Sequence, residues 1–299
     1  MAELRKLHSG RASQPAIVFV HGLGGDLIDT WRHESRSPDD CWPHWLGHDT
    51  GCDVWVLGYD AALSALSEQA MALPDQGDQV ADLLATEPGL RAKRLVMIGH
   101  SMGGLVVKTL LINGRTKGDR RIEQMVARIC AIAFVATPHN GARLASLAKA
   151  LAWVLRTNVQ VDNMSLHDAH LRGLNQQFQN AVQEQAISVR AFAERRGVPV
   201  GIAIGKWRIR TGMSLQVVDV SSADPGLPGV TTVPMAGDHF SVCKPANKGE
   251  HIHKSLCDFI EALHTDNTSG PQPSGDALCH LHRYLFPNQF LRHNRKPEL

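Results

Sequence analysis

The sequence has few aromatic residues, no closely spaced cysteine pairs and no long apolar run. Aromatic residues make up 5% of the 299 residues, and three of the six tryptophans lie within 31–45, which indicates local packing rather than a stacking surface. The formal net charge is only +2, so no field of one sign favours nucleic acid as a partner. No apolar run approaches the roughly 20 residues of a membrane span, so we expect any membrane contact to be peripheral.

The six cysteines do not form a disulfide framework or a zinc-finger pattern. They include no C-x-x-C pair, and residues 1–14 lack the apolar segment of a signal peptide. We therefore expect reduced thiols and a cytoplasmic location, with association with a membrane surface as the alternative. His251-x-His253-x3-Cys257 and Cys279-His280-x-His282 contain metal-ligand residue types, but no pair repeats with zinc spacing. We expect no metal and no cofactor.

Short apolar runs alternate with helical patterns along the chain. This alternation predicts an α/β fold with a mostly parallel sheet and helices on both faces. The expected strands are residues 16–20, 54–58, 95–98, 129–135, 187–193 and 215–220, and the expected helices include 76–87, 105–112 and 248–263.

Composition divides the chain into one large domain and a tail. Residues 1–265 are expected to form the domain, and 266–275 are a linker rich in Gly, Pro and Ser. Residues 276–299 form a basic tail that is weakly packed, binds a partner or membrane surface, or begins a further region. An insertion at about 142–186 predicts two or three helices, which either cap a site or cover an edge of the sheet.

Gly99-His-Ser101-Met-Gly103 matches the pattern G-x-S-x-G. An apolar strand precedes it directly and an apolar helix follows, which is the context of a nucleophile elbow in an α/β-hydrolase fold. We predict that Ser101 is a nucleophile and that Gly99 and Gly103 avoid collisions within the tight turn. The alternative is a serine that caps a glycine-rich helix.

The first expected strand ends at His21-Gly22-Leu23-Gly24-Gly25. In this architecture the loop after that strand supplies one oxyanion-hole amide, and the residue after the nucleophile supplies the other. We assign these amides to Leu23 and Met102. The loop does not match a phosphate-binding motif, because it lacks G-x-G-x-x-G and no Lys-Ser or Lys-Thr follows it.

Chain order selects His239 as the general base from 16 histidines. It follows every expected strand and precedes the last helix, as the order nucleophile, acid, histidine requires. His251 and His253 are expected on the solvent-facing surface of that helix. His139 is expected to pack within a loop.

The acid is either Glu194 or Asp224. Glu194 follows the strand 187–193 and is the preferred candidate if 215–220 is the last central strand. If residues 231–237 form the last strand instead, Asp224 becomes the expected acid. Asp219, within the run 215–220, is a weaker third candidate.

Several blocks of the sequence together carry a family resemblance. They are His21 to Gly25, Asp29-Thr-Trp31, Trp42-Pro43, Leu57 to Asp60, Gly99 to Lys108, Thr137 to Gly141, Phe192-Ala-Glu194, Val217 to Ala223, Asp238-His239 and Cys243-Lys-Pro245. From about residue 15 to 263 the chain resembles the SERAC-type, or DUF676-like, serine esterases and lipases, which are related to the GPI-inositol deacylases. The resemblance implies Ser101 as nucleophile and His239 as base, and its Phe-x-Glu supports Glu194 as acid.

The resemblance implies hydrolysis of an acyl ester, and a lipid or phospholipid is the expected substrate. Related domains occur as modules of larger signalling proteins, so fusion or association with such a protein is a further expectation. The same residues would also serve a thioesterase, an amidase or a peptidase. A hydrolase fold kept as a silent binding module is the alternative from a different class.

Overall fold

The computed structural model describes residues 2–37, 39–59, 61, 73–139, 165–204 and 207–265. The chain divides into a unit of Met1–Ile260, which carries the sheet, and a unit of Glu261–Leu299, whose described residues belong to the end of a helix. The expected linker at 266–275 and the basic tail at 276–299 lie outside the described residues.

The core of the first unit is a seven-stranded sheet among the described residues, in the order β1-β3-β2-β4-β5-β6-β9. The six strands from β3 to β9 in this order are parallel, and β1 pairs with β3 antiparallel. The strands are β1 (Glu3–His8), β2 (Ala16–Val20), β3 (Asp53–Gly58), β4 (Leu95–His100), β5 (Ile129–Val135), β6 (Ser188–Glu194) and β9 (Thr232–Met235).

The central strands are apolar because both faces of the sheet are covered. Every residue of β2, β3 and β4 is buried, as expected for parallel strands between two helical layers. The sequence predicted the strands at 16–20 and 129–135 with these bounds, and the predicted α/β-hydrolase architecture is confirmed. β1 was not predicted, since its sequence, Glu-Leu-Arg-Lys-Leu-His, suits a half-exposed edge strand.

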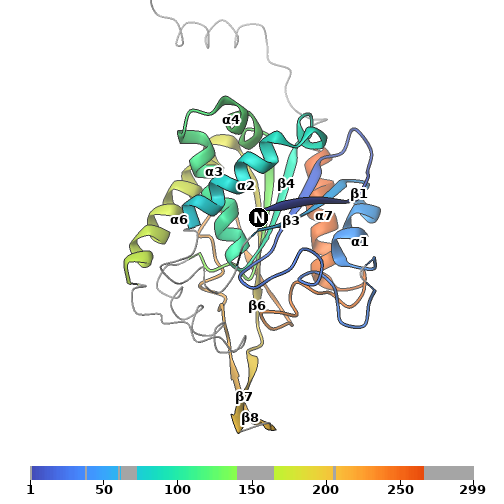
Figure 1. The fold of residues 1–299 in the computed structure, drawn as a ribbon, viewed down its shortest axis with the longest axis vertical. Helices are drawn as coiled ribbons and strands as arrows, with labels where there is room; N and C mark the ends of the chain where they lie inside the picture. The colour runs from blue at the N-terminus through green and yellow to red at the C-terminus, as the bar shows by residue number, and fades with distance from the viewer. Residues whose placement is uncertain are drawn as a thin grey trace, which may run out of the picture. The chain divides into compact units, whose positions relative to one another are not determined.

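Helices cover both faces of the sheet (Figure 1). One layer holds α2 (Leu73–Thr86), α3 (Met102–Thr116), α4 (Arg120–Val126) and α6 (Ser165–Gln185), with α3 packed against the other three. On the other side lie α1 (Trp42–Thr50) and α7 (His251–Thr265), and Trp42 donates a hydrogen bond from α1 to His253 on α7. In the described part of the chain, no helix has the length and apolar character to cross a membrane.

The predicted strand at 215–220 was wrong. A separate hairpin of β7 (Val198–Ile204) and β8 (Trp207–Leu215) follows β6, and β8 ends at Leu215. Residues 216–220 form a loop, and β9 then returns to pair with β6. The apolar run Val217-Val218 is buried although it belongs to no strand, and its amides bond to the side chain of Glu194 at the end of β6.

Half of the predicted insertion is described, and it covers the sheet. α6 packs its buried residues Leu174, Phe178 and Ala181 toward α3 and β5, and Phe178 meets the ring of Phe134 edge-on. The described residues 165–185 therefore lie against α3 and β5, and the prediction of a cap for the insertion as a whole stays a prediction. Residues 140–164, which hold the rest of the insertion, lie outside the described residues.

Candidate active site

Ser101 lies in a sharp turn between β4 and α3. Its backbone has φ 52° and ψ −125°, a strained conformation that holds the side chain above the strand ends. A Cβ on Gly103 would lie 2.3 Å from the carbonyl oxygens of Val20 and His21, and one on Gly99 would lie 2.6 Å from Gly104 Cα. The turn thus requires glycine at both positions, against β2 in one case and against the start of α3 in the other.

Four parallel strands bring the candidate catalytic residues to one edge of the sheet. Ser101 follows β4, Glu194 ends β6, and His239 lies in the loop after β9. Ser101 Oγ is 2.9 Å from His239 Nε2, and Glu194 Oε2 is 2.6 Å from His239 Nδ1. All three residues are at most 1% exposed. The loop after β2, residues 21–25, completes this group of segments.

The loop after β8 holds the Glu194 carboxylate in place. Oε1 of Glu194 accepts hydrogen bonds from the amides of Val217 (2.6 Å) and Val218 (2.9 Å). The side-chain amide of Gln216 donates to the Glu194 carbonyl oxygen at 2.9 Å. The two amides hold the carboxylate through Oε1 and leave Oε2 for His239, while Gln216 anchors the backbone of Glu194.

Asp224, the alternative acid, lies elsewhere. Its side chain is exposed and accepts a hydrogen bond from the amide of Gly226 within its own turn, while Glu194 occupies Nδ1 of His239. Asp219 likewise caps a local turn through the amide of Ser222. β9 is the last strand that the structure describes, yet Asp224 does not reach His239. The hairpin and loop inserted between β6 and β9 add residues to the chain but no strand to the central sheet.

The predicted oxyanion donors border the nucleophile. Met102 is the first residue of α3, where the amide has no partner within the helix, and Leu23 lies in the loop that passes directly beside Ser101. A Cβ on Gly22 would lie 2.7 Å from Ser101 Cβ. Among the described residues, neither amide donates a backbone hydrogen bond in a turn or loop.

A pocket of about 170 Å³ opens at Ser101. Its lining comes from the loop 22–26 with residues 29 and 30, from His100 and Ser101, and from residues 239, 240, 243 and 244. Leu23, Phe240 and Cys243 give it apolar surface, and Lys244 adds a cationic side chain. The pocket therefore forms a partly apolar cleft at Ser101, and Leu23, one of the two predicted oxyanion donors, lines it.

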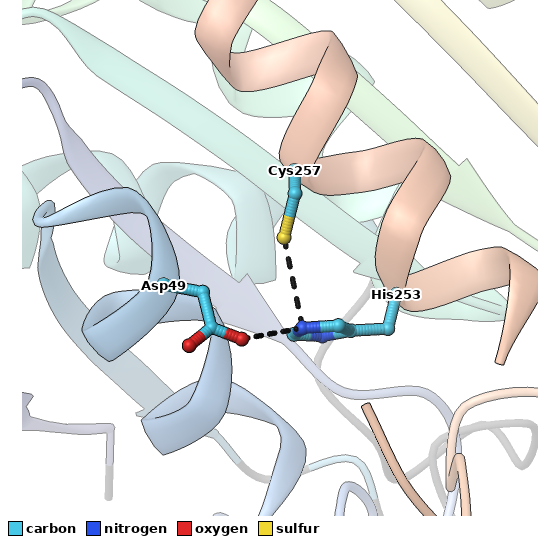
Figure 2. Close-up of side chains that lie close together, drawn as sticks. All are labelled: Asp49, His253 and Cys257. Carbon is cyan, nitrogen blue, oxygen red and sulfur yellow. Dashed lines mark hydrogen bonds and ion pairs between the residues drawn. The ribbon is translucent and has the colours of Figure 1, made fainter. Parts of the chain in front are cut away.

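His253 was expected at the surface and is instead buried. Figure 2 shows its ring beside Asp49, which comes from α1, and Cys257, one turn along α7. Nε2 lies 2.9 Å from Asp49 Oδ2 and 3.6 Å from Cys257 Sγ, and the three ligand atoms lie within 4.8 Å of one another. His251, by contrast, is exposed as expected, and His139 is buried edge-on against Phe134.

The protonation of His253 does not suit a metal ligand. Trp42 Nε1–H donates to Nδ1 at 3.2 Å, so Nδ1 carries the lone pair and Nε2 carries the proton, which it donates to Asp49. A metal at Nε2 would need the opposite tautomer, and two N–H groups would then face each other. Burial would raise the pKa of Asp49, but hydrogen bonds from Lys248, His48 and His253 lower it to about 2. The cluster fits a hydrogen-bonded link between α1 and α7.

Sequence reasoning missed three supports of the site. Val217 and Val218 were assigned to a strand, so their role as backbone donors to Glu194 was not predicted. No side-chain pattern in a sequence identifies such a donor. Tyr59 stacks on His21, with ring centroids 4.7 Å apart, and donates its hydroxyl to the His21 carbonyl oxygen at 2.8 Å. His100 occupies the first variable position of G-x-S-x-G, and the motif assigns no residue type or role to that position.

Comparisons with known proteins agree with the observed fold. Residues 17–241 match the model of the alpha/beta hydrolase family. The chain is 29% identical to Protein SERAC1 of Homo sapiens over 281 residues and 26% identical to that of Danio rerio over 275. These alignments cover 86% and 84% of this chain but only 40% of each relative.

Solved structures show the same fold. The mature lipase BlEst2 of Bacillus licheniformis superposes with a TM-score of 0.57 at 18% identity, covering 87% of this chain and 98% of that one. A carboxylesterase structure from Nitrososphaera gargenis gives 0.53 at 13% identity, covering 89% and 96%. The fold and the family match lead to one conclusion: the chain belongs to the alpha/beta hydrolase family.

Proposed function

We propose that the protein is a serine hydrolase that cleaves carboxylic esters. The observation that carries this proposal is the continuous hydrogen-bonded chain from Ser101 Oγ through His239 to the buried carboxylate of Glu194. A serine that only capped a helix would need neither the positive φ nor the histidine. The arrangement has the parts of a nucleophile, a general base and an orienting acid.

Acylation begins at Ser101. His239 Nε2 takes the hydroxyl proton as Oγ attacks the ester carbonyl carbon, and the carbonyl oxygen becomes an oxyanion. The amides of Leu23 and Met102 would donate hydrogen bonds to it, and such donors typically contribute about 3 kcal/mol each. His239 then passes the proton to the leaving alcohol as the acyl-enzyme forms.

Deacylation repeats these steps with water as the nucleophile. His239 removes a proton from water, the new tetrahedral oxyanion occupies the same two amides, and the acid is released as Ser101 Oγ regains its proton. Glu194 accepts Nδ1–H throughout. It thereby keeps the lone pair on Nε2 toward Ser101 and stabilises the imidazolium formed in each transition state.

A lipid ester is the substrate class we favour. The pocket at Ser101 carries Leu23 and Phe240, and the structural neighbours include a lipase. The chain spans about 40% of the length of its curated relatives, so this proposal concerns the domain. Peripheral contact with a membrane would bring such a domain to its substrate.

Acyl-ester profiling tests the proposal. The purified protein would be incubated with neutral lipid esters, phospholipids, a thioester and an amide of matched acyl chain, and product acids measured. We expect ester cleavage that disappears in Ser101→Ala while the circular dichroism spectrum stays unchanged. Cleavage of the thioester or amide alone would replace the ester proposal. No cleavage of any substrate, with equal results for Ser101→Ala, would favour a silent binding module.

A further inference from the structure

His239 lies in a segment with little regular structure of its own. Residues 236–250, between β9 and α7, form turns and loop. A general base must stay within hydrogen-bonding reach of the nucleophile, and a displacement of about 1 Å can cost about 100-fold in rate. Something must therefore fix the backbone of His239 relative to Ser101, beyond the two hydrogen bonds of its own ring.

The side chain of His100 makes that connection. His100 ends β4 directly before the nucleophile, and its Nε2 lies 2.9 Å from the carbonyl oxygen of His239. A carbonyl only accepts, so His100 Nε2 carries the proton and donates. The two imidazole rings lie with centroids 5.0 Å apart. Two consecutive residues thus hold His239, one by its ring and the other by its backbone.

The same ring borders the loop that carries Leu23. A Cβ on Gly22 would lie 3.3 Å from His100 Nδ1 and 3.0 Å from the His100 carbonyl oxygen, so this loop packs tightly against His100. Nδ1 is buried and has no hydrogen-bond partner among the described residues. One side chain therefore contacts the nucleophile strand, the base loop and the loop of the predicted oxyanion hole.

We propose that His100 is a positioning residue that sets the place of His239 through its Nε2–H donor. This inference rests on the proposed function, because it assigns His100 a part in the same relay. Burial, followed by the neighbouring His239, lowers the pKa of His100 well below its ordinary value. A neutral ring places no second positive charge beside the imidazolium that forms on His239 in the transition state.

The test uses substitutions that differ in reach. In His100→Gln the amide nitrogen is as many bonds from Cα as Nε2 of histidine and can donate to the His239 carbonyl oxygen. In His100→Asn it is one carbon shorter, and His100→Phe keeps a ring without a donor. We expect Asn and Phe to lower kcat by about 10- to 100-fold with KM within about 2-fold, and Gln to stay within about 5-fold of wild type.

Equal kcat in the wild type and all three variants would overturn the proposal, because the hydrogen bond to His239 would then be unnecessary. Equal losses of kcat in His100→Gln and His100→Asn would also overturn it, because the reach of the donor would then not matter. If His100→Phe does not fold, the Gln and Asn pair still decides. A second readout needs no turnover: the downfield proton resonance of His239 Nδ1–H bonded to Glu194. It should persist in Gln and broaden in Asn. A wild-type protein that shows this resonance but no ester cleavage would fail the proposed function while leaving the His100 role measurable.

Discussion

Two buried histidines in this protein each bind a carboxylate through one ring nitrogen. The second ring nitrogen contacts a serine hydroxyl in one case and an indole N–H in the other. His239 donates Nδ1–H to Glu194 at 2.6 Å and turns Nε2 toward the Ser101 hydroxyl. His253 donates Nε2–H to Asp49 at 2.9 Å, while its Nδ1 accepts from Trp42. In the first pair the lone pair faces a hydroxyl that it can deprotonate. In the second the lone pair is occupied by an indole.

The difference shows that a histidine–carboxylate pair does not by itself make a catalytic site. Cys257 supplies a potential nucleophile beside His253, but its sulfur lies near Nε2, the nitrogen that carries the proton. The ring therefore offers the thiol no base. Ser101, in contrast, faces Nε2 of His239, the nitrogen that is not bonded to the carboxylate, and stands in a strained turn. We propose that the partner of the second nitrogen decides whether such a pair can perform chemistry.

The largest expected contrast comes from replacing each histidine with glutamine. His239→Gln should lower kcat/KM for ester hydrolysis by at least about 1,000-fold, because Ser101 loses its base. His253→Gln should leave kcat/KM of the folded protein within about 2-fold and reduce thermal stability instead. Steady-state kinetics and thermal melts on both variants check this. A comparable loss of activity in both would erase the distinction.

Replacing the carboxylates of the two acid candidates gives the next contrast. Glu194→Gln should lower kcat by about 100- to 10,000-fold, because the neutral amide neither fixes the tautomer of His239 nor stabilises its charged form. Gln still offers Oε1 to the amides of Val217 and Val218, so the loop should keep its place. Asp224→Asn is the matched control and should retain wild-type kcat. The account of the acid would be wrong if Asp224→Asn were the damaging change.

A smaller effect, on stability, is expected from removing the indole N–H of Trp42 that donates to His253. Trp42→Phe removes the donor and leaves Nδ1 of His253 buried without a partner, which should lower the free energy of unfolding by about 1–3 kcal/mol. Trp45→Phe is the control on the same helix, since its indole N–H bonds the half-exposed Asp40 and its loss should cost less. Denaturant titrations give both values, and kcat should remain unchanged. A larger loss in Trp45→Phe would show that the His253 link is unimportant.

The smallest effect concerns how the free energy of unfolding changes at acidic pH. The folded-state pKa of Asp49 is about 2, below the value of about 3.9 for an unfolded chain. Its contribution is therefore present above pH 4 and is lost as the pH falls toward 2. The difference in unfolding free energy between wild type and Asp49→Asn should shrink over that window in denaturant titrations. A difference that stays constant from pH 5 to pH 2.5 would contradict the ion-pair assignment.

The local features of this site were predictable from the sequence, and the long-range ones were less so. The turn at Ser101 is specified by the run Leu95 to Gly103, because strand, glycines and helix are neighbours in the chain. The choice of Glu194 rested on the family resemblance of Phe192-x-Glu194 and on an incorrect strand at 215–220. The structure brings Glu194 to His239 for a reason that the strand count did not contain. It ends the strand beside β9, and the hairpin between them adds no strand to the sheet.

Burial of a polar residue was the hardest property to predict. His253 belongs to an amphipathic helix, and a histidine there is usually assigned to the solvent side. Its partners Trp42 and Asp49 lie about 200 residues away, so only the packing of α1 against α7 reveals them. The amides that hold Glu194 were hidden for a related reason, since a buried loop and a buried strand share the same apolar pattern.

Covalent labelling tests the central claim most directly. The protein would be treated with a fluorophosphonate probe, digested, and the modified residue located by mass spectrometry, with Ser101→Ala, His239→Gln and His253→Gln treated in parallel. The account predicts a single modification at Ser101, its absence in Ser101→Ala, much slower labelling in His239→Gln and unchanged labelling in His253→Gln. Labelling at another residue, or no labelling of a folded wild-type protein, would contradict it.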